Sequence, residues 1–219
     1  VDRFSPNEIL AIHRKLMEAA SNPRQAGRVR TVQNWIGGSS FNPCSAAFVP
    51  PPPERVPELM QDLCDFCNDD TLPAIAQAAI AHAQFETIHP FIDGNGRIGR
   101  LLITFLLCQR GVLQRPLLYL SSYLKAHRAE YYDRLMAIRN EGNWEGWLKF
   151  FLRGIRYSGT PLKTLRDAGF NVLTWDSRGF GESGGTVMVE SRLGAGRGGI
   201  EAVHAIPGAD IQHAASGQR

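Results

Sequence analysis

The chain lacks a long hydrophobic run and a strong net charge. Its longest apolar stretch, Leu101–Cys108, is interrupted by Thr104 and is far too short to cross a bilayer. The net charge of +3 is too small to indicate nucleic acid or a membrane surface as a partner. No signal peptide is visible at Val1, so we expect a cytoplasmic protein. Because the first residue is not Met, the chain is also consistent with a fragment whose true N-terminus is missing.

Cysteine is scarce, with four residues in the whole chain. Two of them, Cys64 and Cys67, form a C-x-x-C pair inside the helical pattern Val56–Asn68. No second pair completes a tetrahedral zinc site, and no alternation of strands and helices supports a redox motif. We therefore expect buried, reduced thiols.

What the chain has is helical patterning over its first two-thirds. It holds 219 residues, 43% hydrophobic and 21% charged, enough for one core of ordinary size. Ser5-Pro6-Asn7-Glu8 is a capping box, and the glycines, prolines and β-favouring runs from Ser21 to Pro53 indicate a hairpin and an extended strand. The expected fold is mainly α, a small bundle with a β appendage. The expected helices cover Ser5–Ala20, Val56–Asn68, Pro73–Ile88, Arg97–Arg110, Ser122–Asn140 and Trp144–Ile155.

The segment His89–Arg100 reads HPFIDGNGRIGR and combines the parts of a nucleotide-phosphate site. Gly94 and Gly96 allow successive N–H groups to converge on an anion, just before an apolar helix whose positive dipole end faces the same place. Arg97 and Arg100 lie three residues apart on one helical face and can each fork onto phosphate oxygens. A purely structural interpretation, in which a helix corner carries one histidine and two solvated arginines by chance, explains far less of the pattern.

Two further residues of this segment suit catalysis. Asp93 is a hard oxygen ligand of the kind that binds Mg²⁺ already carried by phosphates. His89 has an unperturbed pKa close to neutrality and can take a proton from an attacking hydroxyl. Phe91, between them, is expected to point into the core and to fix the loop.

The segment resembles the Fic family pattern H-x-F-x-(D/E)-G-N-G-R-x-x-R at every specified position. The resemblance runs from about Phe4 to Ile155. It includes a likeness of Gly27–Gly38 to the family's flap hairpin and of Ala47–Pro53 to the extended segment after it. It implies a Fic-type helical bundle with a β-hairpin flap over about residues 27–50.

The resemblance implies an enzyme that moves AMP from ATP onto a hydroxyl of a target protein and releases diphosphate. ATP and Mg²⁺ are the expected cofactors, with His89 as the catalytic base and Asp93 as the metal ligand. In the family, a tyrosine at the position of Tyr131 lines the nucleotide pocket, and Asn140 is expected to do the same; from the residues alone, Tyr131 and Tyr132 are equally well explained as bundle core. The expected nucleotide-binding residues are Asp93, Gly94, Asn95, Gly96, Arg97, Ile98, Gly99, Arg100, Tyr131 and Asn140.

The expected partner is a target protein held along the hairpin Val29–Ile36 as an added strand. The transferred nucleotide could be another than AMP, and three further alternatives stay open. The first is phosphotransfer, against which Gly96 argues because phosphotransferring relatives are expected to carry Lys at this position. Enzymes that are regulated or that remove AMP carry an inhibitory helix, whose nearest match here, Ala137–Gly142, lacks the required Ser or Thr. That helix would then lie upstream of Val1 or on a partner. Separately, a homodimer is among the expected assemblies. A non-catalytic peptide-binding module is the third alternative.

His82 and Glu86 share a helix face with His89, but the spacing is not that of a metal site. We expect a polar stripe that lines the site or a solvated face instead. The remaining histidines, His13, His127, His204 and His213, belong to no apparent constellation.

The last part of the chain has a different character. We expect one helix at Leu162–Ala168, one strand at Phe170–Trp175, and largely disordered, glycine-rich sequence up to Arg219. Residues 165–185 resemble an early strand and loop of α/β-hydrolases. Gly181–Gly185 fits G-x-S-x-G around Ser183, but no strand leads directly into it and no helix follows, so we expect no catalysis there. The expected domains are therefore a Fic domain at 1–156 and a foreign tail at 157–219.

Overall fold

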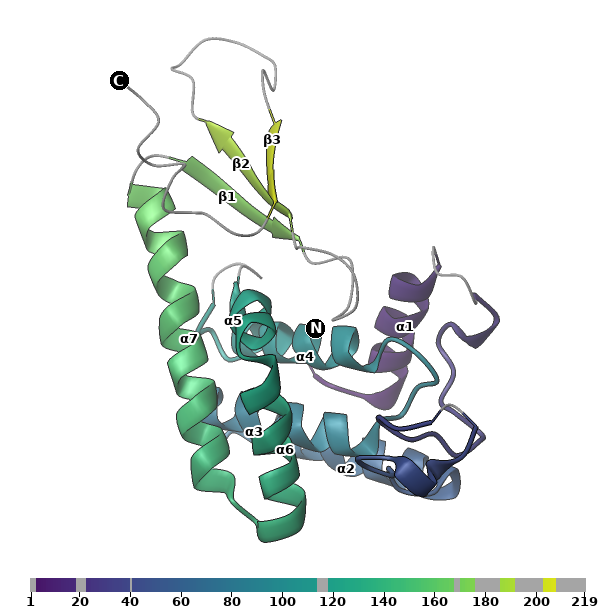
Figure 1. Ribbon diagram of the computed structural model, residues 1–219. Coiled ribbons are helices and arrows are strands. Elements are labelled where there is room, and N and C mark those ends of the chain that lie inside the picture. The colour runs from purple at the N-terminus through teal and green to yellow at the C-terminus, as the bar shows by residue number, and fades with distance from the viewer. Residues whose placement is uncertain are drawn as a thin grey trace. The chain divides into compact units, whose positions relative to one another are not determined.

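The computed structural model describes residues 3–18, 23–39, 41–113, 118–167, 170–175, 186–191 and 203–207, with side chains up to Ser158 (Figure 1). The chain forms two compact units. The first comprises Val1–Pro116 and Leu135–Trp144, and the second comprises Leu117–Arg134 and Glu145–Arg219.

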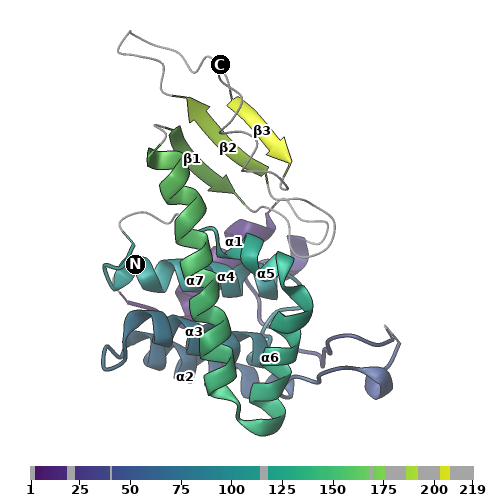
Figure 2. The same cartoon turned by 60° about the vertical axis from the view of Figure 1, so that its left-hand side comes forward.

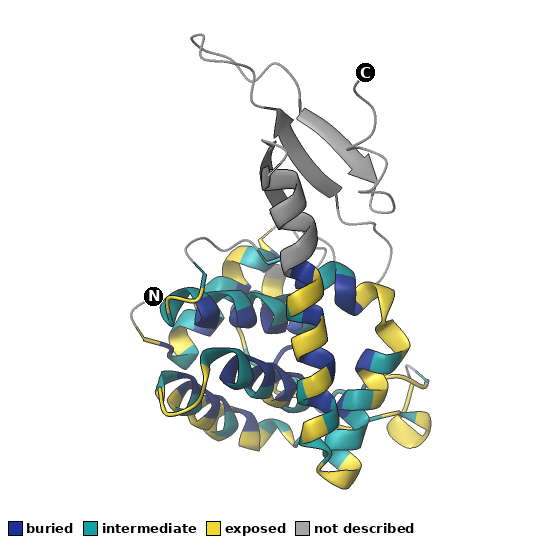
Figure 3. Ribbon diagram, turned by 90° about the vertical axis from the view of Figure 1, so that its left-hand side faces the viewer, coloured by how far each residue is buried: buried dark blue, intermediate teal, exposed yellow. Residues whose placement is uncertain are grey.

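The first unit is built around two helices, α3 (Ala74–Ile88) and α4 (Asn95–Gln109), which pack against each other. α2 (Val56–Asn68) packs on the other side of α3, and α1 (Pro6–Met17) contacts both α2 and α4 (Figure 2). α3 is rich in alanine, so its neighbours approach closely, and most of its residues are buried (Figure 3). This arrangement holds the loop between α3 and α4, which carries the motif, against α1.

The helix ends follow the local sequence, with small departures from expectation. Ser5 caps α1 as predicted, because its Oγ accepts a hydrogen bond from the Glu8 N–H at 3.3 Å. The helix ends at Met17 rather than near Ala20. α4 begins at Asn95, two residues before the predicted start, because Gly94 adopts a left-handed conformation with φ of +85° and serves as its N-cap.

The segment between α1 and α2 is irregular, and the prediction of a hairpin within Val29–Ile36 is wrong. It contains three short 3₁₀ helices, η1 (Pro23–Gln25), η2 (Pro43–Ser45) and η3 (Pro53–Arg55), and no β-strand among its described residues. A single antiparallel bridge joins Ile36 to Phe48 and closes the loop that holds η2. The reason is that polar side chains from residues 30–34 bind carbonyls of distant segments, so this stretch does not pair with its own continuation.

The second unit contains α5 (Leu120–Ala126), the first part of α6 (Arg128–Glu141) and α7 (Trp144–Asp167). The single helix expected over Ser122–Asn140 is divided at His127. Conversely, the two helices expected at Trp144–Ile155 and Leu162–Ala168 are one continuous helix. An aromatic cluster fills this unit and gives α7 a buried face; its members are Tyr123, Tyr131, Trp147, Phe150 and Phe151 (Figure 3).

The tail holds a three-stranded antiparallel sheet in the order β1 (Phe170–Trp175), β2 (Thr186–Ser191), β3 (Val203–Pro207). Val172 pairs with Val189, and Val189 pairs with His204. The expected strand at Phe170–Trp175 is confirmed, whereas β2 and β3 were not expected. Ser183 and the connection that carries it lie outside the described residues.

The fold is mainly α, as the sequence predicts. Within the part of the chain that the structure describes, no helix combines the length and the apolar character needed to traverse a bilayer.

Candidate active site

His89 lies at the C-terminal end of α3 in an unusual backbone conformation. Its N–H closes the last turn of the helix by donating to the Phe85 carbonyl at 2.9 Å, and its φ is +47°. It is the only non-glycine residue with positive φ among those described. Such a conformation is disfavoured for a residue with a Cβ, so surrounding contacts must hold it.

Two side chains from the segment before α2 supply those contacts. The Nε of Arg30 donates to the His89 carbonyl at 2.9 Å, and the Nδ2 of Asn34 donates to the same carbonyl at 3.4 Å. Asn34 also reaches the Phe91 carbonyl at 3.1 Å. The backbone N–H of Arg30 donates to the Pro90 carbonyl at 2.9 Å. The carbonyls of His89, Pro90 and Phe91 thus all accept hydrogen bonds from this segment.

Asn95 fixes the other end of the same loop. Its side-chain amide pairs with the backbone of Phe91, accepting from the N–H at 2.8 Å and donating to the carbonyl at 2.7 Å. The Phe91 side chain is fully buried, which confirms the prediction that it points into the core. Asn95 is itself 4% exposed, so its side chain serves the loop and only its backbone N–H remains for a ligand.

His13 of α1 is a second anchor of the loop, and its assignment to no constellation is wrong. Its Nδ1 accepts from the Gly27 N–H at 2.9 Å, which makes Nε2 the protonated nitrogen that donates to the Asp93 carbonyl at 3.0 Å. Its ring stacks on Phe91 with centroids 3.7 Å apart. Burial lowers the pKa of His13, so the neutral tautomer that makes both bonds is favoured.

The N-terminus of α4 presents a set of backbone donors. Helix geometry leaves the N–H groups of Asn95, Gly96 and Arg97 without an intrahelical carbonyl, and Ile98 makes the first helical bond, to Gly94 at 3.0 Å. The positive end of the helix dipole lies at the same point. Such an arrangement of N–H donors and helix dipole is suited to binding an anion such as a phosphate group.

Charged side chains flank these donors. The Nη2 of Arg97 lies 3.2 Å from Oδ2 of Asp93 and 3.3 Å from the Met17 sulfur. The other oxygen of Asp93 accepts from the Gly94 N–H at 2.6 Å. Arg100 folds back toward the start of its helix, since a Cβ on Gly96 would lie 3.1 Å from its Nη1. Arg97 and Arg100 therefore both belong to the start of α4, as predicted, although each has different neighbours.

Glu86 and His82 of α3 lie directly under α4, so of the two alternatives, a polar stripe that lines the site and a solvated face, the solvated face is wrong. Both are buried, at 7% and 0% exposure. A Cβ on Gly99 would come within 2.6 Å of the Glu86 Oε1 and 3.1 Å of the His82 Nδ1. Gly99 is thus required for the close packing of α4 on α3, which is a structural role inside the motif.

The surroundings of His89 favour its neutral, proton-accepting form. Burial is the main cause that lowers its pKa to about 4. A hydrogen bond to the Glu86 backbone opposes this shift, and the positive charges of Arg139 and Arg30 add to it. At neutral pH the imidazole is therefore available as a base.

Glu86 titrates in the opposite sense. Burial raises its pKa to about 7, although the positive charges of Arg100 and Arg139 counteract the effect. Burial also lowers the pKa of His82 to about 4. No cluster of three or more metal-ligating side chains exists in the described part of the chain.

Comparison with known proteins shows which family the sequence of this region matches. Residues 3–107 match the model of the Fic/DOC family, and this range includes the whole loop and the start of α4. The chain contains a Fic/DOC family domain.

Relatives and solved structures extend the similarity. The chain is 36% identical over 174 residues to protein adenylyltransferase fic-1 of Caenorhabditis elegans, which covers 76% of this chain and 31% of that protein. It is 39% identical over 84 residues to a probable protein adenylyltransferase of Aquifex aeolicus, covering 38% and 26%. A Fic family protein of Desulfovibrio desulfuricans superposes with a TM-score of 0.63 at 26% identity, covering 79% of this chain and 55% of that one. The chain spans about a third or less of these curated relatives.

The remaining predicted residues of the Fic domain have diverse surroundings. Ile98 is 2% exposed, so its side chain belongs to the core. Tyr131 is 2% exposed and packs against Trp147 in the second unit, at 6.0 Å between ring centroids. Asn140 is exposed in the first unit. A contact of Tyr131 or Asn140 with the nucleotide stays a prediction.

Sequence reasoning missed Arg139. Its guanidinium donates to the Glu86 carbonyl at 3.1 Å and to the Thr87 Oγ1 at 3.2 Å, and it lies over the Phe48 ring at 3.8 Å. It therefore links the end of α3 to the Ile36–Phe48 bridge. No local sequence pattern indicates this arginine.

His13 does have a local signal. It lies four residues after Ile9 and four before Met17, on the buried face of α1, and this spacing predicts a buried position.

The thiols agree with expectation. Cys64 and Cys67 are buried and free, and burial raises the pKa of each to about 12. The raised pKa values disfavour the thiolate form, on which redox and metal-binding chemistry of cysteine depends.

Proposed function

We propose that this chain transfers AMP from ATP to a hydroxyl side chain of a target protein. The observation that carries the proposal is the loop between α3 and α4. It joins a histidine that is neutral at physiological pH to the phosphate-binding start of a helix, through the Asn95–Phe91 hydrogen bonds. The names of the relatives, protein adenylyltransferases, support the same activity.

In the proposed reaction, His89 takes the proton from a Tyr, Thr or Ser hydroxyl of the target. The hydroxyl oxygen forms a bond to the α-phosphorus as the bond to the β-phosphate oxygen breaks, and diphosphate leaves. The lowered pKa of His89 keeps its imidazole unprotonated at neutral pH. The rate enhancement then comes mainly from positioning and from electrostatic stabilisation of the phosphates.

In this proposal the N-terminal end of α4 binds the phosphates. The N–H groups of Asn95, Gly96 and Arg97 face the anion, and the guanidinium groups of Arg97 and Arg100 neutralise the negative charge that develops on diphosphate. Ile98 and Gly99 support this set through packing. Gly96 leaves room for the Arg100 side chain to fold back over the first turn.

Asp93 fits a magnesium ion that accompanies ATP. Its side chain is exposed, and Mg²⁺ is commonly held by one or two carboxylates together with substrate phosphates and water. Bound there, the ion would neutralise phosphate charge. Asp93 would have to release Arg97 in part, which is an inexpensive change for an ion pair whose carboxylate is exposed.

The acceptor protein and the control of the reaction complete the proposal. We place the target along the flap segment, beside the Ile36–Phe48 bridge, where its main chain would add as an extended strand. Inhibition by a helix upstream or on a partner, and association of two copies, remain part of the proposal. A cytoplasmic location, where ATP is available, also belongs to it.

One experiment tests the activity. The chain is incubated with a cell lysate and Mg²⁺, once with ATP labelled at the α-phosphate and once with ATP labelled at the γ-phosphate. We expect label from the α-phosphate alone on protein, and mass spectrometry should locate an AMP adduct on a hydroxyl residue. Transfer of the γ-label instead would show phosphotransfer and refute the proposal.

A further inference from the structure

Arg30 is one of the largest fully buried side chains of the domain, with 1% exposure. Burying a guanidinium is costly unless its donors are satisfied. The hydrogen bonds that the structure shows for it all go to backbone carbonyl oxygens, those of Val32, Pro51, Ile88 and His89. The side chain is therefore placed to hold backbone.

Two of these carbonyls, those of Ile88 and His89, belong to the turn that carries the proposed base. Nε donates to His89 at 2.9 Å and Nη2 to Ile88 at 3.3 Å, at the C-terminal end of α3 where unpaired carbonyls and the negative end of the dipole gather. The other two, on Val32 and Pro51, lie on either side of the loop closed by the Ile36–Phe48 bridge. One guanidinium thus joins that loop to the turn carrying the proposed base.

We propose that Arg30 is a positioning residue for His89, holding the histidine in its left-handed conformation and aiming the imidazole at the reacting hydroxyl. The proposal rests on the proposed function of His89. A turn with φ of +47° at a residue with a Cβ persists only when its surroundings determine it, and Arg30 makes the shortest contact from a side chain to that residue's carbonyl.

Lysine cannot replace Arg30 in this role. The planar guanidinium reaches four carbonyls in different directions because its donors are fixed in a fork, whereas an ammonium is a single point on a flexible stem. Lysine would keep the positive charge near His89 and lose the geometry. The two substitutions Arg30→Lys and Arg30→Met therefore separate charge from position.

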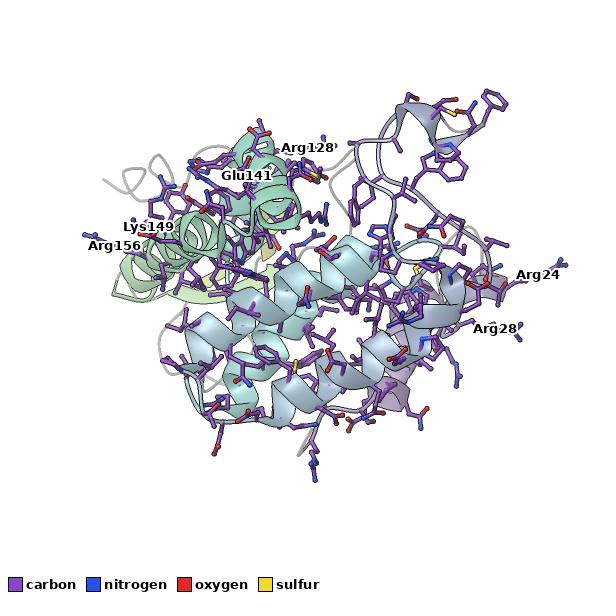
Figure 4. All side chains as sticks on the ribbon, turned by 90° about the horizontal axis from the view of Figure 1, so that it is seen from below. Arg24, Arg28, Arg128, Glu141, Lys149 and Arg156 are labelled. Atoms are coloured by element: carbon purple, nitrogen blue, oxygen red, sulfur yellow. The ribbon has the colours of Figure 1, made fainter. Side chains whose placement is uncertain are left out.

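The test compares both variants with Arg24→Met, a matched control six residues away and outside the flap. Arg24 is exposed and its side chain extends outward from the domain (Figure 4). In Arg30→Met and Arg30→Lys we expect kcat for AMP transfer to fall by about 10²-fold, with KM for ATP within about twofold of the wild type, because the loss is one of alignment. Arg24→Met should behave as the wild type.

A second measurement is the NMR titration of the His89 imidazole, together with the backbone shifts of His89 that report its φ. Removal of the Arg30 charge should raise the pKa of His89 in Arg30→Met, whereas Arg30→Lys should leave that pKa near the wild-type value. Both variants should shift the His89 backbone resonances. If Arg30→Met fails to fold, Arg30→Lys alone decides the question.

A folded Arg30→Lys with wild-type kcat, or with unchanged His89 backbone shifts, would overturn the positioning role. An equal loss of activity and of folded fraction, with normal kcat per folded molecule, would do the same. Failure of the proposed function looks different. The wild type would transfer no AMP, while the NMR shifts would still report whether Arg30 holds the turn.

Discussion

The side-chain amide of Asn95 pairs with the backbone of Phe91 through two hydrogen bonds, of 2.8 Å and 2.7 Å. The pair closes the loop that leads from His89 into α4, and both residues are buried. Because the loop is closed by a side chain at the first position of α4, the position of His89 is tied to the N-terminus of that helix. The proposed base and the proposed phosphate site are thereby held by one loop.

Replacement of His89 by alanine should separate these two tasks. We expect His89→Ala to lose transfer by about 10²–10⁴-fold, because it removes a general base. ATP affinity, measured by calorimetry, should change little because the phosphate donors are on α4. The control is His127→Ala, an exposed histidine outside the motif. Near wild-type transfer by His89→Ala would contradict the mechanism.

The two motif arginines should differ in their effects. Arg97→Ala should reduce kcat strongly, because a charge-assisted contact that strengthens in the transition state is lost. The fold should survive, since the ion pair with Asp93 is largely exposed on the carboxylate side and contributes little. Arg100→Ala should weaken ATP binding more than it slows chemistry. The exposed Arg24, replaced by alanine, is the control (Figure 4). Equal affinity of the wild type for ATP and AMP would show that neither arginine binds the outer phosphates.

Local signals explain what the sequence predicts well. The capping box at Ser5 and the helical periodicity locate α1 to α4 within a few residues, and the motif locates His89 and the start of α4. Nothing local indicates that Arg30 is buried, because its partners at Ile88 and His89 are nearly sixty residues away. The glycines, prolines and β-favouring residues between Ser21 and Pro53 predict a hairpin that does not form. Long-range hydrogen bonds from side chains take the place of the expected strand pairing.

The close approach of α4 to α3 makes Gly99 sensitive to substitution. Gly99→Ala would place a Cβ 2.6 Å from the Glu86 Oε1 and 3.1 Å from the His82 Nδ1, both of them buried side chains, and should cost about 1–3 kcal/mol of stability. In Gly96→Ala the new Cβ meets only the end of the Arg100 side chain at 3.1 Å and Glu86 at 3.9 Å, so its unfolding midpoint should stay near that of the wild type.

A double-mutant cycle in urea unfolding checks the cause. Truncation in Glu86→Ala should recover part of the stability lost in Gly99→Ala, because the carboxylate is the group that clashes. Additive effects of the two substitutions would show that the clash lies elsewhere.

Glu86 should give the domain a distinctive dependence of stability on pH. Its folded pKa of about 7 lies above the unfolded value of 4.5, so the folded state retains a proton that the unfolded state loses between those values. The free energy of unfolding should therefore fall as pH rises from about 4.5 to 7, by up to about 1.4 kcal/mol per pH unit for this group. Glu86→Gln removes this effect and should be more stable than the wild type at pH 7, but not near pH 4.

The buried histidines act in the opposite direction and must be separated from this effect. His82 and His89 have lowered pKa values in the folded state, so stability falls as pH drops from 6.5 toward about 4. The difference between wild type and Glu86→Gln cancels their contribution because both chains carry them. Glu141→Gln, at an exposed position, is the control (Figure 4). A stability difference that does not change between pH 4 and pH 7 would refute the assignment.

The tail beyond α7 should be dispensable for folding of the domain and for transfer. The aromatic cluster of the second unit is complete before Gly159, and the last described buried side chain of α7 is Ser158, whose Oγ donates to the Gly154 carbonyl at 2.7 Å. A chain that ends at Asp167 keeps all of α7 and removes the β1–β2–β3 sheet. We expect it to unfold at the same midpoint as the full chain and to transfer AMP at the same rate.

A chain that ends at Tyr157 removes Ser158 and the last turns of α7, so its midpoint should be lower. Full-length Ser183→Ala is the control for a catalytic role of the G-x-S-x-G sequence, and it should be fully active. A marked loss of stability on ending the chain at Asp167, or a loss of activity that Ser183→Ala reproduces, would show that the tail is a working part of the protein.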